Sequence, residues 1–261
     1  MKFQKKSLGQ NFLIDKNIVR KIINLVEINN QNIVEIGPGE GALTDEILKK
    51  KPKSLILIEK DSNLVKKLKI KYSKNKKIRI YDADILKFNI DKIKKRDFIV
   101  FGNLPYNISS QILVKFLKSK KWPPNFNDIV FMFQKELGEK IIGKFPSLSY
   151  GRLSILSNYR LSLINKFLVS RNSFFPKPKI TSMVIHLKPK KKIISSIKKI
   201  DNLEKITNIL FSNKRKMINK NIKKILNFDK IKKVKGLKLN FRPSEIKPEI
   251  YYKITELYEK S

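Results

Sequence analysis

The sequence contains no cysteine and one histidine, His186, among its 261 residues. Without cysteine, the chain has no disulfide bonds, iron–sulfur clusters or thiolate zinc sites. His186 lies in the apolar run from Met183 to Leu187, which is typical of a strand. With no second histidine, histidine-based catalytic triads and multi-histidine metal sites are poor hypotheses. We therefore expect no metal site.

Long apolar runs and acidic residues are also scarce. No apolar run approaches the roughly 18 residues of a membrane span, and the basic amino-terminal segment lacks the apolar stretch of a signal peptide. We expect a soluble protein that acts in the cytoplasm. There are 59 Lys and Arg against 22 Asp and Glu, for a formal net charge of +37. This charge favours nucleic acid as partner, although the joint abundance of Lys, Ile and Asn indicates a compositional bias that inflates its size.

Strand-like and helix-like segments alternate between about residues 15 and 145. Helices are predicted over 42–50 and 62–72, and strands over 33–36, 55–58, 78–81, 98–101 and 129–133. This alternation predicts an α/β fold, a Rossmann-like parallel sheet with helices on both faces. Two later strands, 167–169 and 182–187, are separated only by a Pro-rich turn. They predict an antiparallel edge to the sheet.

The composition changes at the lysine run near residues 189–192. Beyond it strand signals are few, and apolar residues recur at helical spacing over 203–228. We therefore divide the chain into an α/β domain, residues 1–189, and a small helical domain, residues 190–261. The lysines of the helical domain either contact phosphates or form an ordinary solvated helix face.

Candidate cofactor-binding residues follow the first three predicted strands. The segment from Glu35 to Gly41 is rich in glycine, which lets a backbone turn tightly and approach a ligand, but it lacks the Gly-Lys-Ser/Thr ending of a phosphate loop. Glu35 itself can receive a cationic amine or order the loop. Glu59, at the end of the second strand, can hold both ribose hydroxyls, and Asp84 can accept a hydrogen bond from an adenine amino group. Together they favour a methyl-donor or dinucleotide cofactor.

The segment Asn103-Leu104-Pro105-Tyr106 follows the fourth predicted strand. An amide, a stiffened turn and an aromatic ring suit the binding of a flat base that bears an amine; the alternative is a turn that only closes the strand. A hydride-transfer role does not suit this loop. Hydrogen bonds from an adenine amine to the Asn103 side-chain oxygen and the Leu104 carbonyl would instead direct the nitrogen lone pair toward a sulfonium methyl. That mechanism needs no strong general base.

Several short segments occur in the order found in one known family. They begin at Gly9 to Leu13, end at Arg242 to Glu245, and include EIGPGEGALT (35–44), DADIL (82–86), FGNLPYNIS (101–109), FMFQKE (131–136), YGRLS (150–154), FFPKPKITS (174–182) and the basic segment 214–221. In this series the chain resembles the ribosomal RNA adenine N6-dimethyltransferases that use S-adenosylmethionine, most closely their small-subunit branch. The resemblance implies a class I methyltransferase domain and an RNA-binding helical domain.

The resemblance also implies the reaction and the partner. Members of this branch methylate two adjacent adenosines twice each, in the hairpin near the 3′ end of small-subunit ribosomal RNA. By resemblance, the partner of this chain is that RNA within an immature 30S-type particle, and the chain acts as a monomer. The expected entry step is the flipping of an adenine from its stack.

The matching positions give individual residues their implied roles. Those matching cofactor contacts are Asn11, Leu13, Gly37, Glu59, Asp84 and Asn103. Those matching the catalytic loop are Asn103, Leu104, Pro105 and Tyr106, and Phe174 matches an aromatic residue that packs against the target base. Tyr106 and Phe174 are thus expected to form an aromatic clamp. Asp82 is a rival of Asp84 for the cofactor adenine, and Lys177 and Thr181 vary the Pro-rich turn.

Two alternative functions have some support. A related resistance family dimethylates an adenosine of large-subunit ribosomal RNA and shares the glycine loop, the Asn-Leu-Pro-Tyr loop and the Pro-rich turn. Pro38, the FMFQKE segment and the basic carboxyl-terminal segment favour the small-subunit branch. The second alternative is a non-catalytic ribosome-assembly factor on a methyltransferase fold. The presence of Glu59, Asp84 and Asn103 argues against a loss of catalytic activity.

Overall fold

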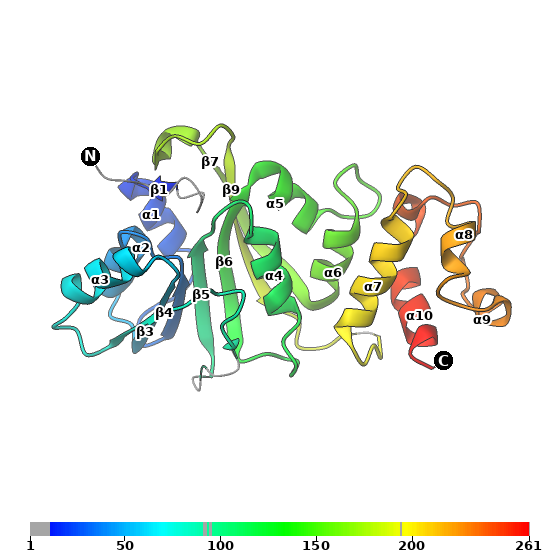
Figure 1. Ribbon diagram of the computed structural model, residues 1–261, viewed down its shortest axis with the longest axis horizontal. Helices are drawn as coiled ribbons and strands as arrows, with labels where there is room; N and C mark the ends of the chain where they lie inside the picture. The colour runs from blue at the N-terminus through cyan, green and yellow to red at the C-terminus, as the bar shows by residue number, and fades with distance from the viewer. Residues whose placement is uncertain (1–10, 91–92, 94–95, 194, 261) are drawn as a thin grey trace. The chain divides into compact units, whose positions relative to one another are not determined.

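The computed structural model describes residues 11–90, 93, 96–193 and 195–260 (Figure 1). Gly9 and Gln10, at which the family resemblance begins, lie outside the described residues. The chain forms two compact units. The first comprises residues 1–138 and 163–189, and the second comprises residues 139–162 and 190–261.

A seven-stranded sheet dominates the first unit (Figure 1). Its strands lie in the order β4-β3-β2-β5-β6-β9-β7, with bounds β4 Ile78–Asp82, β3 Ser54–Glu59, β2 Asn32–Ile36, β5 Phe98–Asn103, β6 Phe126–Gln134, β9 Ser182–Pro189 and β7 Leu161–Val169. The strands β2 to β6 pair in parallel, and β9 is antiparallel to β6. The predicted α/β class and the predicted antiparallel addition are both confirmed.

Helices bury both faces of this sheet. They are α1 (Lys16–Ile23), α2 (Ala42–Lys49), α3 (Ser62–Lys71) and α4 (Ser109–Leu117), while α5 (Lys135–Ile142) begins in the first unit and ends in the second. Apolar side chains of α1, α2 and α3 share one core cluster with those of the strands, such as Leu57 and Phe101. Against the other face, Phe116 of α4 packs edge-to-face on Phe126 and Phe131 of β6. Because both faces are covered, the parallel strands read as continuous apolar runs.

A short ribbon of two strands belongs to the same unit. Strand β1 (Phe12–Leu13) pairs antiparallel with β8 (Phe174–Phe175), so that Leu13 lies opposite Phe174. Both of these residues are buried in the core cluster. The ribbon was not predicted, because two-residue strands carry no periodic pattern that a sequence can reveal.

The second unit is helical. Its helices are α6 (Arg152–Arg160), α7 (Ile200–Phe211), α8 (Asn219–Ile222), α9 (Phe228–Lys232) and α10 (Pro248–Tyr258). The apolar pattern over 203–228 is divided among separate helices. The first ends where the Ser212 hydroxyl donates to the Ile209 carbonyl, and Asn227 caps the start of α9 by accepting from the Lys230 amide. Such local side-chain bonds compete with continued helix.

Residues 139–162 group with the helical unit, whereas the sequence analysis assigned them to the α/β domain. The Tyr150 hydroxyl donates to the Ile246 carbonyl at 2.8 Å, and the Tyr252 hydroxyl donates to the Ile155 carbonyl at 3.3 Å. These bonds join segments that lie far apart in the chain, so no local pattern signals them. Across the described parts of the chain, none of the helices has the length and apolar character that crossing a bilayer requires.

Candidate cofactor and catalytic site

The carboxyl ends of β3, β2 and β5 meet at one edge of the sheet. In the parallel register, Ile36 lies between Ile58 of β3 and Gly102 of β5. Gly37, Glu59 and Asn103 are the residues that come next, so they lie side by side. This edge is where ligands bind in open α/β sheets.

A cavity of about 310 Å³ opens at this edge. That volume lies within the range of about 300–1,000 Å³ that is usual for ligand pockets. The cavity brings together all of the predicted site residues except Phe174, and its lining includes Asn11, Leu13, Gly37, Glu59, Asp84, Asn103, Leu104, Pro105 and Tyr106. All of these residues belong to the first unit.

The glycine loop between β2 and α2 requires glycine for two different reasons. Gly37 has φ +64°, a left-handed conformation that side chains disfavour, and its amide donates to the Ile58 carbonyl at 2.9 Å. A Cβ on Gly39 would lie only 3.0 Å from the ring of Phe12. The loop therefore folds closely against β3 and against the β1 segment.

The carboxylate of Glu59 accepts three backbone amides. Oε1 accepts from Lys60 and Asp61, each at 2.9 Å, and Oε2 accepts from Gly39 at 3.2 Å. Burial raises the pKa of Glu59, and the three amide bonds oppose that rise. Glu59 thus ties the glycine loop to the turn after β3 while it faces the cavity.

Asp84 lines the cavity together with Lys60, which the sequence analysis did not single out. Lys60 Nζ lies 2.8 Å from Asp84 Oδ2, and the Leu86 amide donates to Oδ1. The hydrogen bond from Lys60 lowers the pKa of Asp84 and keeps it ionised. Asp82 instead accepts from the Ser62 hydroxyl at 3.2 Å and is not among the lining residues. This arrangement favours Asp84 over its rival.

The side-chain amide of Asn103 has a defined orientation. Its Nδ2 donates to the backbone carbonyl of Asn11 at 3.0 Å, which leaves Oδ1 as the atom that can accept from a ligand. The following residue, Leu104, is buried, and it fits because Gly102 has no side chain: a Cβ there would lie 2.6 Å from Leu104 Cδ2. The bond from Asn103 to Asn11 and the packing of Leu104 against Gly102 therefore both fix the position of the loop.

Tyr106 is fixed by a bond from its hydroxyl to Ser182 Oγ at 2.6 Å, and burial raises its pKa. The structure does not bring Phe174 to the same cavity. Phe174 is 3% exposed and packs in the core with Leu13, while its neighbour Phe175 is 64% exposed. Tyr106 and Phe174 thus do not form the expected clamp among the described residues, because the β1–β8 pairing turns Phe174 inward.

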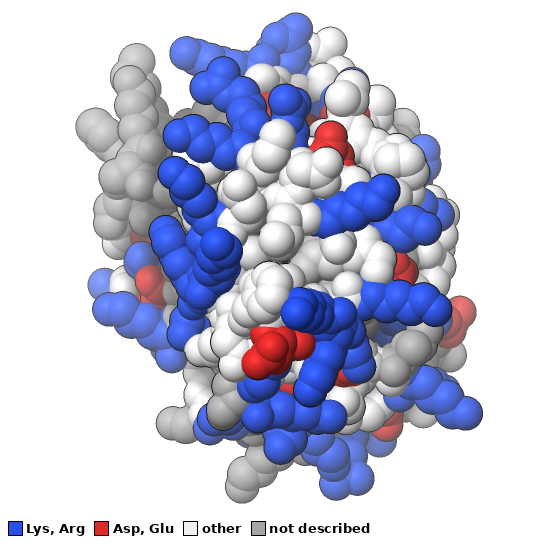
Figure 2. Space-filling view, turned by 90° about the vertical axis from the view of Figure 1, so that its right-hand side faces the viewer, with Lys and Arg blue, Asp and Glu red and all other residues white. Residues whose placement is uncertain are grey.

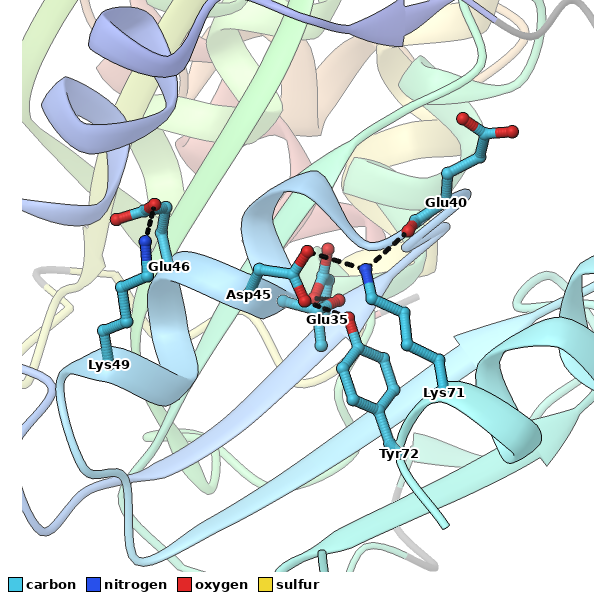
Figure 3. Close-up of polar contacts among 8 residues, drawn as sticks. Glu35, Glu40, Asp45, Glu46, Lys49, Lys71 and Tyr72 are labelled. Carbon is cyan, nitrogen blue, oxygen red and sulfur yellow. Dashed lines mark hydrogen bonds and ion pairs between the residues drawn. The ribbon is translucent and has the colours of Figure 1, made fainter. Parts of the chain in front are cut away.

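Glu35 lies beneath the glycine loop and is buried (Figure 3). Its Oε2 accepts from the Thr44 hydroxyl of α2 at 2.6 Å. Burial raises the pKa of Glu35 to about 8, and the Thr44 bond opposes this shift. The sequence suggested two roles for Glu35, binding a cationic amine or ordering the loop. The structure shows a contact for the second role, and its partner is the Thr44 hydroxyl rather than a backbone amide.

Phe12, Thr44 and Lys60 are among the residues near the cavity to which the sequence analysis gave no role. Lys60 directly follows Glu59, and Thr44 lies within the matched segment 35–44, so proximity to the motifs is the signal that would have found them. Phe12 lies within the matched segment from Gly9 to Leu13, but its approach to Gly39 depends on the ribbon of β1 and β8, which has no sequence signal of its own.

Comparisons with known proteins find relatives that match nearly the whole chain. The family model described as ribosomal RNA adenine dimethylase matches residues 1–260. A protein of Pelagibacter ubique (strain HTCC1062) named ribosomal RNA small subunit methyltransferase A is 44% identical over 259 residues, which cover 98% of this chain and 97% of that protein. A protein of the same name from Mycoplasma mobile is 39% identical over 253 residues, or 95% of each chain.

Solved structures show the same architecture. A dimethyladenosine transferase from Plasmodium falciparum is similar with a TM-score of 0.79 at 25% identity, covering 95% of this chain and 98% of that one. The 23S rRNA methyltransferase ErmE has a TM-score of 0.70 at 22% identity, covering 95% of this chain and 100% of that one. The second likeness shows a shared fold.

The raised pKa of Glu35 predicts a pH-dependent stability. Because its pKa rises from about 4.5 to about 8 on folding, the folded chain keeps a proton that the unfolded chain releases. The contribution of Glu35 to the free energy of unfolding should therefore fall as the pH rises through this window. Glu35→Gln removes this titration, so the wild type should lose up to about 1.4 kcal/mol per pH unit relative to the variant.

Urea unfolding of both proteins without ligand, between about pH 5 and about pH 8, measures that difference. Wild-type and variant stabilities that change in parallel with pH would contradict the raised pKa.

Proposed function

The chain belongs to the ribosomal RNA adenine dimethylase family, and from that premise we propose that it transfers methyl groups from S-adenosylmethionine to N6 of adenosines in small-subunit ribosomal RNA. The observation that carries the proposal is the oriented amide of Asn103, which lines the same cavity as Glu59 and Asp84. The cavity supplies a place for a nucleoside cofactor, and Oδ1 of Asn103 supplies an acceptor for an adenine amine.

The cavity residues fit S-adenosylmethionine. Glu59 would hold the ribose hydroxyls, since Oε2 accepts only the Gly39 amide among the bonds described above. Asp84 would accept from the cofactor adenine, and the glycine loop would surround the methionine portion. When bound, the cofactor supplies the methyl group on a cationic sulfur.

The Asn103 loop would act on the target base. An exocyclic adenine amine is a poor nucleophile because its lone pair is delocalised into the ring. If its N–H groups donate to Asn103 Oδ1 and to the Leu104 carbonyl, the lone pair is directed toward the methyl group. The ring of Tyr106, fixed by Ser182, would stack on the base. Phe174 remains a proposed second aromatic contact that requires a rearrangement of the β1–β8 ribbon.

The substrate is proposed from the relatives. Proteins named small subunit methyltransferase A match nearly the full length of this chain. We therefore favour two adjacent adenosines in the 3′ hairpin of small-subunit RNA, each dimethylated after flipping from its stack. The chain would act as a monomer in the cytoplasm, on an immature 30S-type particle.

Residues 190–261 are proposed to bind RNA. The residues of the segment Lys214-Arg215-Lys216 are exposed, as are Lys223 and Lys224. The face drawn in Figure 2 carries far more Lys and Arg than Asp and Glu. With a net charge of +37, the chain has the electrostatic character of a protein that contacts phosphates.

Labelled methyl transfer tests the choice of substrate. We expect label from S-adenosylmethionine to enter unmethylated small ribosomal subunits and to appear, after digestion, as dimethyladenosine. Label on large-subunit RNA alone would assign the chain to the resistance-type reaction. No transfer to either subunit would favour the assembly-factor alternative.

Asn103→Ala tests the catalytic loop. The variant should lose methyl transfer by about 100-fold or more, because the amine loses its acceptor, while it still binds S-adenosylhomocysteine. Asn63→Ala, which changes an exposed asparagine on α3, is the matched control and should keep wild-type turnover. Turnover by Asn103→Ala at the rate of the control would refute the proposed mechanism.

Salt dependence tests the RNA-binding role of the basic residues. Phosphate contacts release counterions, so the affinity for RNA should fall linearly on a log–log plot against salt concentration. Replacing Lys214 and Lys216 by Gln should weaken binding and reduce the slope by about one to two units. An unchanged slope would mean that these lysines are only a solvated surface.

A further inference from the structure

The carboxyl end of α3 is joined to the start of α2 by contacts outside the proposed reaction. The Tyr72 hydroxyl donates to Asp45 Oδ1 at 2.6 Å, and Lys71 Nζ donates to Asp45 Oδ2 at 2.6 Å (Figure 3). Lys71 Nζ also donates to the backbone carbonyl of Glu40 at 3.2 Å. Two adjacent residues thus occupy both oxygens of one carboxylate and one carbonyl of the glycine loop. We call this arrangement the latch.

The latch packs tightly against the glycine loop. Gly41, which follows the Glu40 carbonyl, has φ +91° and forms the cap of α2. A Cβ on Gly41 would lie 2.3 Å from the Tyr72 hydroxyl oxygen and 3.1 Å from Lys71 Nζ. The conformation of the loop and the position of the latch therefore depend on each other.

The latch also lies at the acidic side of the cavity. Glu35, Glu40 and Asp45 all line the cavity. Burial is the main cause of the raised pKa of Glu35; the charge of Asp45 adds to the rise and the charge of Lys71 opposes it, so the latch acts electrostatically on the buried acid. Because folded Glu35 keeps its proton near neutral pH, Glu40 and Asp45 are the acids of this group that favour a positively charged ligand group. S-adenosylmethionine carries an ammonium group on its amino-acid end and a sulfonium at its centre.

We propose that Lys71 and Tyr72 are positioning residues that shape the glycine loop in advance for the amino-acid end of the cofactor, with its ammonium group. This inference rests on the proposed cofactor and deepens it. Without the latch the loop must be ordered when the ligand binds, and that ordering lowers affinity. The groups assigned to the target base, Asn103 and Tyr106, are not part of the latch. The expected effect is therefore on cofactor KM, with kcat at saturating cofactor unchanged.

Two ligands separate a positioning role from a general structural one. S-adenosylhomocysteine has the amino-acid end, whereas 5′-methylthioadenosine keeps the nucleoside and lacks that end. By isothermal titration calorimetry, Tyr72→Phe and Lys71→Met should each weaken S-adenosylhomocysteine binding by about 5- to 30-fold, as loss of one hydrogen bond predicts. Binding of 5′-methylthioadenosine should stay within about 2-fold of wild type. Lys69→Met, on the exposed face of α3, is the matched control.

A third variant tests the coupling between loop and latch. Gly41→Ala should weaken S-adenosylhomocysteine binding in the wild type, and it should weaken it less in Tyr72→Phe, where the hydroxyl that the new Cβ meets is gone. Equal losses in the two backgrounds would show that the loop and the latch act independently. Tyr72→Phe removes a single hydroxyl, so it provides the test even if the other variants do not fold.

The outcomes distinguish the inference from the proposed function. If the wild type binds neither ligand, the proposed cofactor is wrong. If the wild type binds both and the latch variants bind both equally well, or lose both to the same extent, the positioning role is refuted. If the latch variants lose affinity for S-adenosylhomocysteine and keep their affinity for 5′-methylthioadenosine, the positioning role is supported.

Discussion

The parallel register of β2 between β3 and β5 is the constraint on which the site depends. Pairing Ile36 with both Ile58 and Gly102 places the glycine loop, Glu59 and Asn103 at one edge. A slip of one residue would turn these side chains to the opposite face of the sheet. The apolar residues buried on both faces oppose such a slip. The core of the first unit therefore sets the geometry of the cavity before any ligand binds.

The polar groups at that edge are held by bonds that offset their burial. Glu59 accepts three amides, Glu35 accepts the Thr44 hydroxyl, and Asp45 accepts from the latch. Unpaired, such buried or partly buried acids would be costly. Paired, they hold the glycine loop in a left-handed conformation that leaves backbone and carboxylates facing the cavity. The same bonds that stabilise the loop thus prepare it for a cationic ligand.

The sequence predicted those parts of the fold that are coded locally. Apolar runs such as 98–101 mark buried parallel strands, and the strand ends located Glu59, Asp84 and Asn103 correctly at one cavity. Features that depend on distant contacts were not predictable. The inward position of Phe174 follows from its pairing with Leu13, and the membership of 139–162 in the helical unit follows from bonds such as Tyr150 to Ile246. The latch joins Tyr72 to Asp45, and no local pattern links these two residues.

The most direct test of the account is a crystal structure of the protein with S-adenosylhomocysteine and adenosine monophosphate. We predict that the adenine N6 lies about 3 Å from Asn103 Oδ1 and from the Leu104 carbonyl, with the cofactor sulfur on its other side. Asn103 Nδ2 should keep its bond to the Asn11 carbonyl. An adenine whose N6 points away from Asn103, or a cofactor bound outside the glycine loop, would contradict the central claim.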